Sequence, residues 1–205
     1  MKNVHNNGIL PTMKSHFSLS QYRSFDLISF AVITAVFEGL IAFASTRLFP
    51  DQLYVVSAVA GITAIVMVRW KYAGILPAFV GGFVLCTAYG GSPRQYLVYC
   101  IGNLLGIFGV FIQKLIREEK MRANSFLAML YGISVLFLMQ TGRALVALIL
   151  GYELKDVAFF YTTDSLSYIF VAVILLVASR QDGMLEDQVH YIRRIQESGD
   201  SGKTD

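Results

Sequence analysis

The sequence predicts an all-α membrane protein with six transmembrane helices and both termini in the cytoplasm. Its composition is the first observation that supports this class. The chain is 55% hydrophobic and only 15% charged, whereas soluble globular domains carry about 25% charged residues. The second observation is that apolar residues come in long blocks, and a helix needs about 20 of them to cross the hydrocarbon.

Six blocks are the predicted spans. In chain order they are Leu27–Thr46, Leu53–Val68, Tyr72–Tyr89, Gln95–Gln113, Ser125–Leu150 and Val157–Ser179. The first is interrupted by Glu38 and the last by Asp164. The second is short, and we predict that Arg69-Trp70-Lys71 anchors its end at the membrane interface, where aromatic rings and snorkelling cations are typical.

Turn-forming residues and charges separate the blocks. The first external loop contains Phe49-Pro50-Asp51, and the second is Gly90-Gly91-Ser92-Pro93, in which Pro93 suits the first turn of the fourth helix. The main cytoplasmic loop, 114–124, carries the run Arg117-Glu118-Glu119-Lys120, which we interpret as a solvated charge run.

Polar segments flank the membrane domain, which we predict over 25–180. Residues 1–24 form a polar cytoplasmic leader, and 181–205 form a cytoplasmic tail. Within the tail, 184–195 reads MLEDQVHYIRRI and places its apolar side chains on one helical face. This pattern predicts an amphipathic helix on the membrane surface, with a solvated tail as the alternative.

The distribution of Lys and Arg predicts the orientation, because cytoplasmic loops of membrane proteins carry an excess of both. With the N-terminus inside, only Arg47, Arg94 and Lys155 lie in external segments. The cytoplasmic set is Lys2, Lys14, Arg23, Arg69, Lys71, Lys114, Arg117, Lys120, Arg122, Arg180, Arg193, Arg194 and Lys203. This topology accounts for the net charge of +3 without a nucleic-acid partner.

Arg143 is the only charged residue between Ser125 and Leu150. A charge in hydrocarbon costs from about 2.5 to over 10 kcal/mol, so it normally faces a partner or a watery cavity. Glu38, near the middle of the first block, is a candidate partner. A structural Glu38–Arg143 pair, a ligand contact and a combination of the two are the alternatives.

Other polar residues fall at a similar depth if each helix rises about 1.5 Å per residue. Asn103 lies near mid-span, and Gln140, Arg143 and Asp164 lie from mid-depth to the outer side. Gln140 and Arg143 are three apart and so share a helix face. The aromatic members of the set are Tyr96, Tyr99, Tyr161 and Tyr168. We predict that these side chains line a cavity that opens to the outside.

Small residues spaced four apart mark close helix contacts in membranes. Ala31 and Ala35 form such a pair in the cytoplasmic half of the first helix, and Gly102 and Gly106 form another in the fourth. For each pair, the alternatives are a partner interface and internal packing.

Catalytic and metal-site chemistry finds little support in the sequence. The three histidines, His5, His16 and His190, all lie in terminal segments, which disfavours haem or histidine-based metal sites within the membrane. The chain has no Gly-x-x-x-x-Gly-Lys-Ser/Thr phosphate-binding loop for ATP hydrolysis. Cys86 and Cys100 lie in apolar blocks, which predicts buried packing residues. We therefore expect no enzyme activity and no cofactor.

Taken together, these features resemble a known family. Six helices with both ends inside, Ala31-x-x-x-Ala35, a Pro-containing first external loop and a polar outer cavity are similar to the substrate-binding S-component of energy-coupling factor (ECF) transporters. The segments YVVSAVAGITAIVMVRW (54–70) and QYLVYCIGN (95–103) look like an uncharacterised bacterial branch of that family. The resemblance covers roughly 25–180.

The resemblance implies that the chain binds a vitamin or related micronutrient from outside the bacterial cytoplasmic membrane. It would dock through Ala31 and Ala35 on a transmembrane coupling protein that carries two ATPase subunits, then topple and release the substrate inside. The implied substrate-binding residues are Arg143, Gln140, Asn103, Asp164, Tyr96, Tyr99 and Tyr168, with a cap that includes Phe49, Asp51 and Gln52, and Glu38 as a further candidate.

Residue types narrow the ligand. The start Met1-Lys2 lacks the Met-His motif of the nickel and cobalt branch, so a metal substrate is disfavoured. Arg143 favours a carboxylate or phosphate, whereas Glu38 and Asp164 suit an amine-bearing or nucleobase-like ligand such as a deazapurine or pteridine. Two other classes are alternatives: a six-helix scaffold protein of the cell-wall machinery, and a stand-alone small-molecule carrier.

Overall fold

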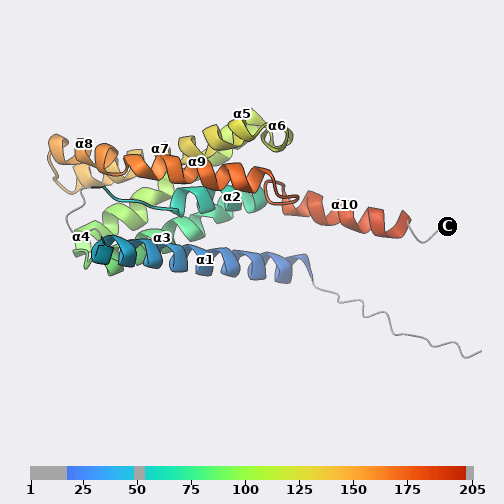
Figure 1. Ribbon diagram of the computed structural model, residues 1–205, viewed down its shortest axis with the longest axis horizontal. Helices are drawn as coiled ribbons and strands as arrows, with labels where there is room; N and C mark the ends of the chain where they lie inside the picture. Colours follow the sequence, from blue (N-terminus) through green and yellow to red (C-terminus); the bar gives the residue numbers. More distant parts are fainter. Residues whose placement is uncertain (1–17, 49–53, 202–205) are drawn as a thin grey trace, which may run out of the picture.

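A computed structural model describes residues 18–48 and 54–201 (Figure 1). Within these ranges the chain is helical and has no β-strand, which confirms the predicted all-α class. The predicted cap residues Phe49, Asp51 and Gln52 lie outside the described residues.

The helical elements follow one another with short connections. They are α1 (Leu19–Leu48), α2 (Val59–Trp70), η1 (Lys71–Gly74), α3 (Ile75–Ala88), α4 (Pro93–Tyr96), η2 (Leu97–Ile101), η3 (Asn103–Phe108), α5 (Gly109–Ile116), α6 (Glu118–Ala123), α7 (Ser125–Ile149), α8 (Leu154–Thr163), α9 (Ser165–Ser179) and α10 (Gln188–Ser201). The elements from α4 to α5 form one continuous helical rod. Pro93 occupies the first turn of α4, as predicted, and Ser92 caps it.

The longer helices lie roughly along the long axis of the molecule, so the bundle has two distinct ends (Figure 1). Helices α4 and α8 lie at one end, and α5, α6 and α10 lie at the other. The second end gathers basic side chains, including Lys71, Lys114, Arg117 and Arg122, which line one cavity there. We call it the basic end.

Several helices are long and apolar enough to cross a membrane. These are Leu19–Leu48, the run Val59–Ala88, Pro93–Ile116 and Ser125–Ile149, and α8 with α9 makes a fifth if this pair, bent by 42°, counts as one span. Ile28, Leu40 and Phe43 on α1 are 61–63% exposed. Soluble proteins rarely expose apolar patches of this extent, so the bundle is compatible with a membrane-embedded protein.

The run Val59–Ala88 folds back on itself at Lys71, where φ is 53°. Its two legs, α2 and α3, pack side by side. They are so close that a β-carbon at Gly81 would lie 2.1 Å from Val59 Cγ2. Every residue of α2 is buried. This is the position expected of a helix that is apolar on all sides, at the centre of a bundle.

The predicted interfacial anchor at the end of α2 is wrong in one respect. Arg69 and Trp70 are buried, not lipid-facing. Arg69 forms a two-point ion pair with Asp26 of α1, and the Trp70 Nε1 donates to the same carboxylate at 2.6 Å. Both side chains therefore face Asp26 of α1 inside the bundle. The sequence around Arg69 and Trp70 contains no information about this partner.

Two further boundaries differ from the prediction. Helix α1 begins at Leu19, inside the predicted polar leader, because Ser18 and Gln21 bond reciprocally to each other's backbone N–H and cap the helix. The second predicted span is helical only from Val59, because residues 54–58 have no regular secondary structure.

The tail also differs from the predicted helix over 184–195. Helix α10 begins only at Gln188, and Leu185 lies in the preceding turn, buried in the main core with residues such as Met67 and Leu175. Leu185 is thus part of the core and does not lie on the predicted apolar face of an amphipathic helix.

Candidate functional site

Two glycines bring the backbones of α7 and the α4–α5 rod into contact. A β-carbon at Gly142 would lie 2.1 Å from the carbonyl oxygen of Gly102, and one at Gly102 would lie 2.6 Å from the Cα of Arg143. Only residues without a side chain allow so close an approach. The contact confirms that Gly102 belongs to an internal helix contact, and it sets Arg143 beside Asn103.

The rod changes its helical pitch at this crossing. Its η2 segment, which includes Tyr99, is a π-helical turn, and η3, which starts at Asn103, is a 3-10 helix. Such irregular turns occur often at functional sites, because they re-aim side chains relative to a regular α-helix. Here they direct Tyr99 and Asn103 toward Arg143.

The guanidinium of Arg143 is buried and held from three sides. Its Nε donates to Asn103 Oδ1 at 2.6 Å, and its Nη1 donates to Asp164 Oδ2 at 2.9 Å. The ring of Tyr99 lies 4.8 Å from the guanidinium carbon, in cation–π geometry. Its Nη2 forms no hydrogen bond with the part of the chain that the structure describes.

Asp164 sits at the break between α8 and α9, where the backbone bends by 42°. Its carboxylate accepts from Arg143, from Gln140 Nε2 at 3.2 Å and from the hydroxyl of Ser167. The Tyr168 hydroxyl in turn donates to Gln140 Oε1. The bend between α8 and α9 thus places the buried Asp164 carboxylate beside the buried Arg143 guanidinium. Neutral side chains also donate hydrogen bonds to this carboxylate.

The suggested Glu38–Arg143 pair does not form. Glu38 instead accepts hydrogen bonds from the backbone N–H of Ala58 at 2.6 Å and the hydroxyl of Ser57 at 3.1 Å, just before α2 begins. The N-terminus of a helix favours a negative charge and leaves backbone N–H groups without partners. Glu38 therefore holds the start of α2, while its second oxygen, Oε2, is buried without a partner among the described residues.

Two serines connect Glu38 to the Arg143 cluster. The backbone N–H of Ser57 donates to Ser167 Oγ at 3.0 Å, and the Ser167 hydroxyl reaches Asp164. In the non-helical segment 54–58, the backbone N–H groups of Ser57 and Ala58 donate to these side chains, and the Val55 N–H donates to the Thr163 carbonyl at 2.8 Å. Non-helical backbone within a membrane bundle requires such protein partners.

A cavity of about 240 Å³ lies next to the cluster, at the α4 end of the bundle. It is lined by Val55, Leu85, Cys86, Tyr89, Gly91, Gln95 and Tyr99. Tyr99 belongs to both features, since one part of it lines the cavity and its ring covers Arg143. The site is therefore a mainly apolar recess with a buried cation behind one aromatic wall.

Most of the predicted site residues come together, and some do not. Asn103, Gln140, Arg143, Asp164, Tyr99 and Tyr168 form one connected cluster. Tyr96 points elsewhere, with its hydroxyl 3.0 Å from Thr87 Oγ1 and its ring against Phe83. Tyr161 bonds to Thr141 instead of joining the cluster.

Sequence reasoning missed Ser57 and Ser167. Ser57 is an isolated serine within an apolar block, whereas Ser167 closes the mainly polar run 162–167 and follows Asp164 by three positions, which is the spacing of a helix-start hydrogen bond. Cys86 and Cys100 are buried free thiols, as predicted.

No group of three or more His, Cys, Asp or Glu side chains within the described residues could hold a metal ion. No protein-family model, curated protein or solved structure matches this chain. Its function is therefore inferred from its residues and their geometry.

Proposed function

We propose that this chain is the substrate-binding S-component of an ECF-type importer in the bacterial cytoplasmic membrane. In this role it crosses the membrane six times, with the basic end and both termini in the cytoplasm, and binds a small micronutrient from the other side. The observation that carries the proposal is the cavity beside Tyr99, because it joins a partly aromatic recess to a buried cation near the α4 end.

The fold-back at Lys71 supports six crossings, because it divides the apolar run Val59–Ala88 into two legs. Helix α2 supplies about 18 Å at 1.5 Å per residue. Residues 54–57, which precede it without helical structure, add up to about 13 Å at 3.3 Å per residue. This leg therefore matches a hydrocarbon core of about 30 Å. The excess of Lys and Arg at the basic end then follows the positive-inside rule.

The cavity suits a flat ring compound. At about 240 Å³ it is smaller than the roughly 300–1,000 Å³ typical of pockets for drug-sized ligands. Tyr89 and Tyr99 offer ring faces for stacking, and Gln95 offers its amide N–H groups as donors while its Oε1 accepts from the Ser92 N–H. Arg143 lies directly behind Tyr99; Asp164 balances its charge, but its Nη2 remains as a donor for an acceptor substituent of the ligand. A nucleobase-like or pteridine-like molecule meets these requirements.

A stripe of small residues on α1 supports docking on a coupling protein. Ala31, Ala35 and Gly39 are spaced four apart, the two alanines are only partly buried, and a β-carbon at Gly39 would meet nothing within 4 Å. Close helix approach uses such surfaces. The sequence of this chain has no P-loop, so the two ATPase subunits of the coupling module would supply the energy.

Docking is tested by co-purification of the coupling protein and ATPases with variants of α1. We expect Ala31→Trp and Ala35→Trp to prevent assembly while ligand binding persists. Val32→Trp is the matched control, because Val32 lies on the exposed apolar side. Normal assembly of both alanine variants would contradict this docking face without touching the proposed ligand site.

The proposed binding activity is tested by a thermal-shift screen of the detergent-purified chain with vitamins, nucleobases and pterins. A specific ligand at 100 times its Kd stabilises a protein by about 2.7 kcal/mol, which is a measurable rise in Tm. A rise that is lost in Tyr99→Leu would support binding in the cavity. No response to any of these compounds would favour the scaffold alternative.

One observation favours that scaffold as a second candidate. The Arg143–Asp164 pair is satisfied within the protein by Asn103 and Gln140. Such a pair needs no ligand to remain buried. A scaffold would keep its unfolding temperature across the whole ligand screen.

A further inference from the structure

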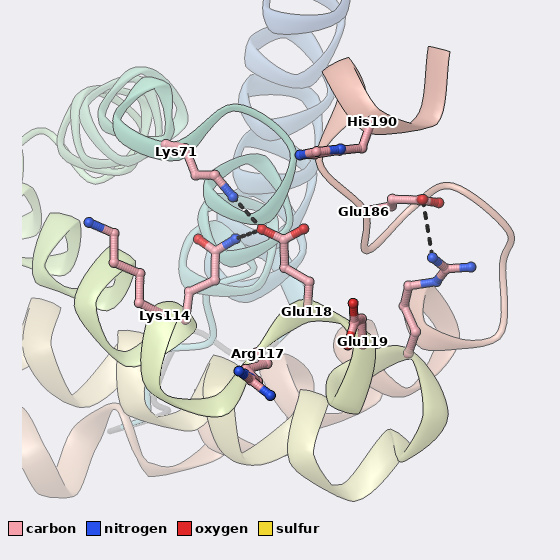
Figure 2. Close-up of a pocket in the computed structure, with 9 residues that line it drawn as sticks. Lys71, Lys114, Arg117, Glu118, Glu119, Glu186 and His190 are labelled. Carbon is pink, nitrogen blue, oxygen red and sulfur yellow. Dashed lines mark hydrogen bonds and ion pairs between the residues drawn. The ribbon is translucent and has the colours of Figure 1, made fainter. Parts of the chain in front are cut away.

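A second and larger cavity, of about 660 Å³, lies at the basic end (Figure 2). It is lined by Lys71, Gln113, Lys114, Arg117, Glu118, Glu119, Arg122, Glu186 and His190. These residues come from the α2–η1 turn, from α5, α6 and the residue between them, and from α10 and the segment that leads into it. The charge run predicted to be solvated therefore forms one wall of a built cavity.

The two central carboxylates of this cavity are already engaged. Glu118 accepts from Lys71 and from Gln113 Nε2 at 2.8 Å, and its second oxygen accepts from the Asp187 N–H at 3.3 Å. Figure 2 shows Lys71 and Glu118 pointing toward each other at the centre of the view. Internal partners thus compensate this acid.

Glu186, on the α10 side, is engaged in the same way. Arg122 Nη1 lies 3.1 Å from one of its oxygens, and Arg194 Nη2 lies 3.0 Å from the other. Glu118 and Glu186 are therefore compensated, whereas the exposed Glu119 forms no ion pair with a described residue. The lining still has four Lys and Arg side chains against three carboxylates, so it stays net positive.

Two cations remain unmatched. Lys114 and Arg117 form no ion pair with any described residue, and both point away from the Lys71–Glu118 pair (Figure 2). The amino group of Lys114 instead lies 5.7 Å from the centroid of the Phe111 ring. Both cations are exposed, so they are available to a ligand that approaches from outside.

The backbone is strained at this cavity. Lys71 and Arg117, with φ of 53° and 67°, are the non-glycine residues of positive φ in the described ranges, and both line it. Such conformations cost about 1–3 kcal/mol each and persist mainly where the surroundings or a function require them. Arg117 forms the strained turn between α5 and α6, and this backbone conformation sets the direction of the Arg117 side chain.

The cavity also contains an unused hydrogen-bond acceptor. Gln113 is 2% exposed, and its Oε1 is buried without a partner among the described residues, although its Nε2 is bonded to Glu118. An unsatisfied buried carbonyl costs about 1–3 kcal/mol. A hydroxyl group of a bound ligand would satisfy it.

The neighbouring surface is apolar. Phe111 and Leu115 lie on α5 beside Lys114 and are 56% and 84% exposed. In a membrane-embedded bundle these side chains face lipid, and cations at this level attract the anionic headgroups of the cytoplasmic leaflet. The occupant that fits both features has a phosphate, a hydroxyl-bearing head and apolar tails.

We propose that this cavity binds the headgroup of an anionic phospholipid of the phosphatidylglycerol type. Its phosphate lies between Lys114 and Arg117, a glycerol hydroxyl donates toward Gln113 Oε1, and its acyl chains run along Phe111 and Leu115. This site lies at the opposite end of the bundle from the cavity beside Tyr99, and it does not depend on the proposed import function.

The test uses the full-length chain in detergent with dioctanoyl phosphatidylglycerol. Dioctanoyl phosphatidylcholine controls for the acyl chains, and inorganic phosphate controls for a free anion. Tm and binding isotherms are the measurements. We expect a saturable rise in Tm with the glycerol lipid and a much smaller response to both controls.

Three variants locate the binding. Lys114→Gln and Arg117→Gly should each weaken the affinity for the glycerol lipid about tenfold, the effect of one lost charge-assisted hydrogen bond. Arg117→Gly also removes the backbone strain, so its Tm without lipid should not fall. Lys120→Gln is the matched control, because this exposed lysine on α6 does not line the cavity.

Three results would overturn the proposal. An equal response to the choline lipid would show binding through the acyl chains alone. An equal response to inorganic phosphate would assign the site to a free anion and not to a lipid. An equal loss of lipid affinity in Lys120→Gln would show that the positive charge of the whole basic end attracts the lipid, without a specific site.

Discussion

Arg143 and Asp164, 21 positions apart in the chain, form a buried ion pair of 2.9 Å between Nη1 and Oδ2. Asn103 holds the same guanidinium from the neighbouring rod at 2.6 Å. Three helical segments are thus tied together at one point, and the wall of the cavity beside Tyr99 rests on that point.

Removing one member of this pair should be more harmful than removing both. We expect Arg143→Met to destabilise the bundle by about 3–5 kcal/mol, because Asp164 is left buried without its cation. The double variant Arg143→Met with Asp164→Leu should recover much of that loss. Thermal unfolding in detergent measures both effects, and an additive loss in the double variant would contradict the coupling.

Ligand binding should respond differently to the same residue. If Arg143 supplies charge to the ligand, Arg143→Ala weakens binding more than tenfold while the protein still inserts. Arg143→Lys should also bind poorly, since an ammonium cannot bond to Asn103 and Asp164 in the geometry of the guanidinium fork. Unchanged affinity in these variants would assign Arg143 a structural role only.

Tyr99 should matter for binding, and Tyr96 should not. Replacing Tyr99 by Leu removes the aromatic wall that separates the cavity from Arg143, so we expect at least a tenfold loss of ligand affinity. Tyr96→Leu is the matched control, three residues earlier on the same rod but bonded to Thr87 outside the cluster. Equal losses in both variants would argue against the cavity beside Tyr99 as the ligand site.

The helix crossing should tolerate no added side chain. Gly142→Ala would place a β-carbon 2.1 Å from the Gly102 oxygen, and such overpacking costs about 1–3 kcal/mol. Gly39→Ala makes the same chemical change on α1 where nothing lies within 4 Å. It should be neutral or stabilising by up to about 1 kcal/mol. Comparison of the two Tm values checks this prediction.

Glu38 should act as an acceptor for the start of α2. Glu38→Gln keeps an oxygen for the Ala58 N–H, so we expect a small change in Tm. Glu38→Leu leaves that N–H buried without a partner and should cost about 1–3 kcal/mol. Thr34→Val, on the same buried face of α1, removes only a bond within its own helix turn. A larger loss in Thr34→Val than in Glu38→Leu would contradict the role of Glu38.

Much of the candidate site could be predicted from depth alone. A rise of about 1.5 Å per residue was enough to group Asn103, Gln140, Arg143 and Asp164 at one level of the bundle. The same depth argument groups Tyr96 with Tyr99, but the π-helical turn separates them, because the rod is not a regular α-helix there.

The other wrong predictions concern residues whose environment depends on the neighbouring helix. Whether Arg69 and Trp70 face lipid or Asp26, and whether Leu185 lies on a surface helix or in the core, depends on which element packs against them. Local patterns of apolar and charged residues contain no information about that partner.

Composition and block length predict a helical chain that is apolar enough for a membrane and basic toward one end, because both act locally and add up along the chain. Which carboxylate faces Arg143 depends on tertiary contacts that these local patterns do not contain. Glu38 and Asp164 lie at similar depth, but Ser57 and Ala58 bind Glu38, and the Gly102–Gly142 crossing turns Arg143 toward Asn103 and Asp164. Depth follows from counting residues, whereas rotation and pairing follow from how close two backbones can come.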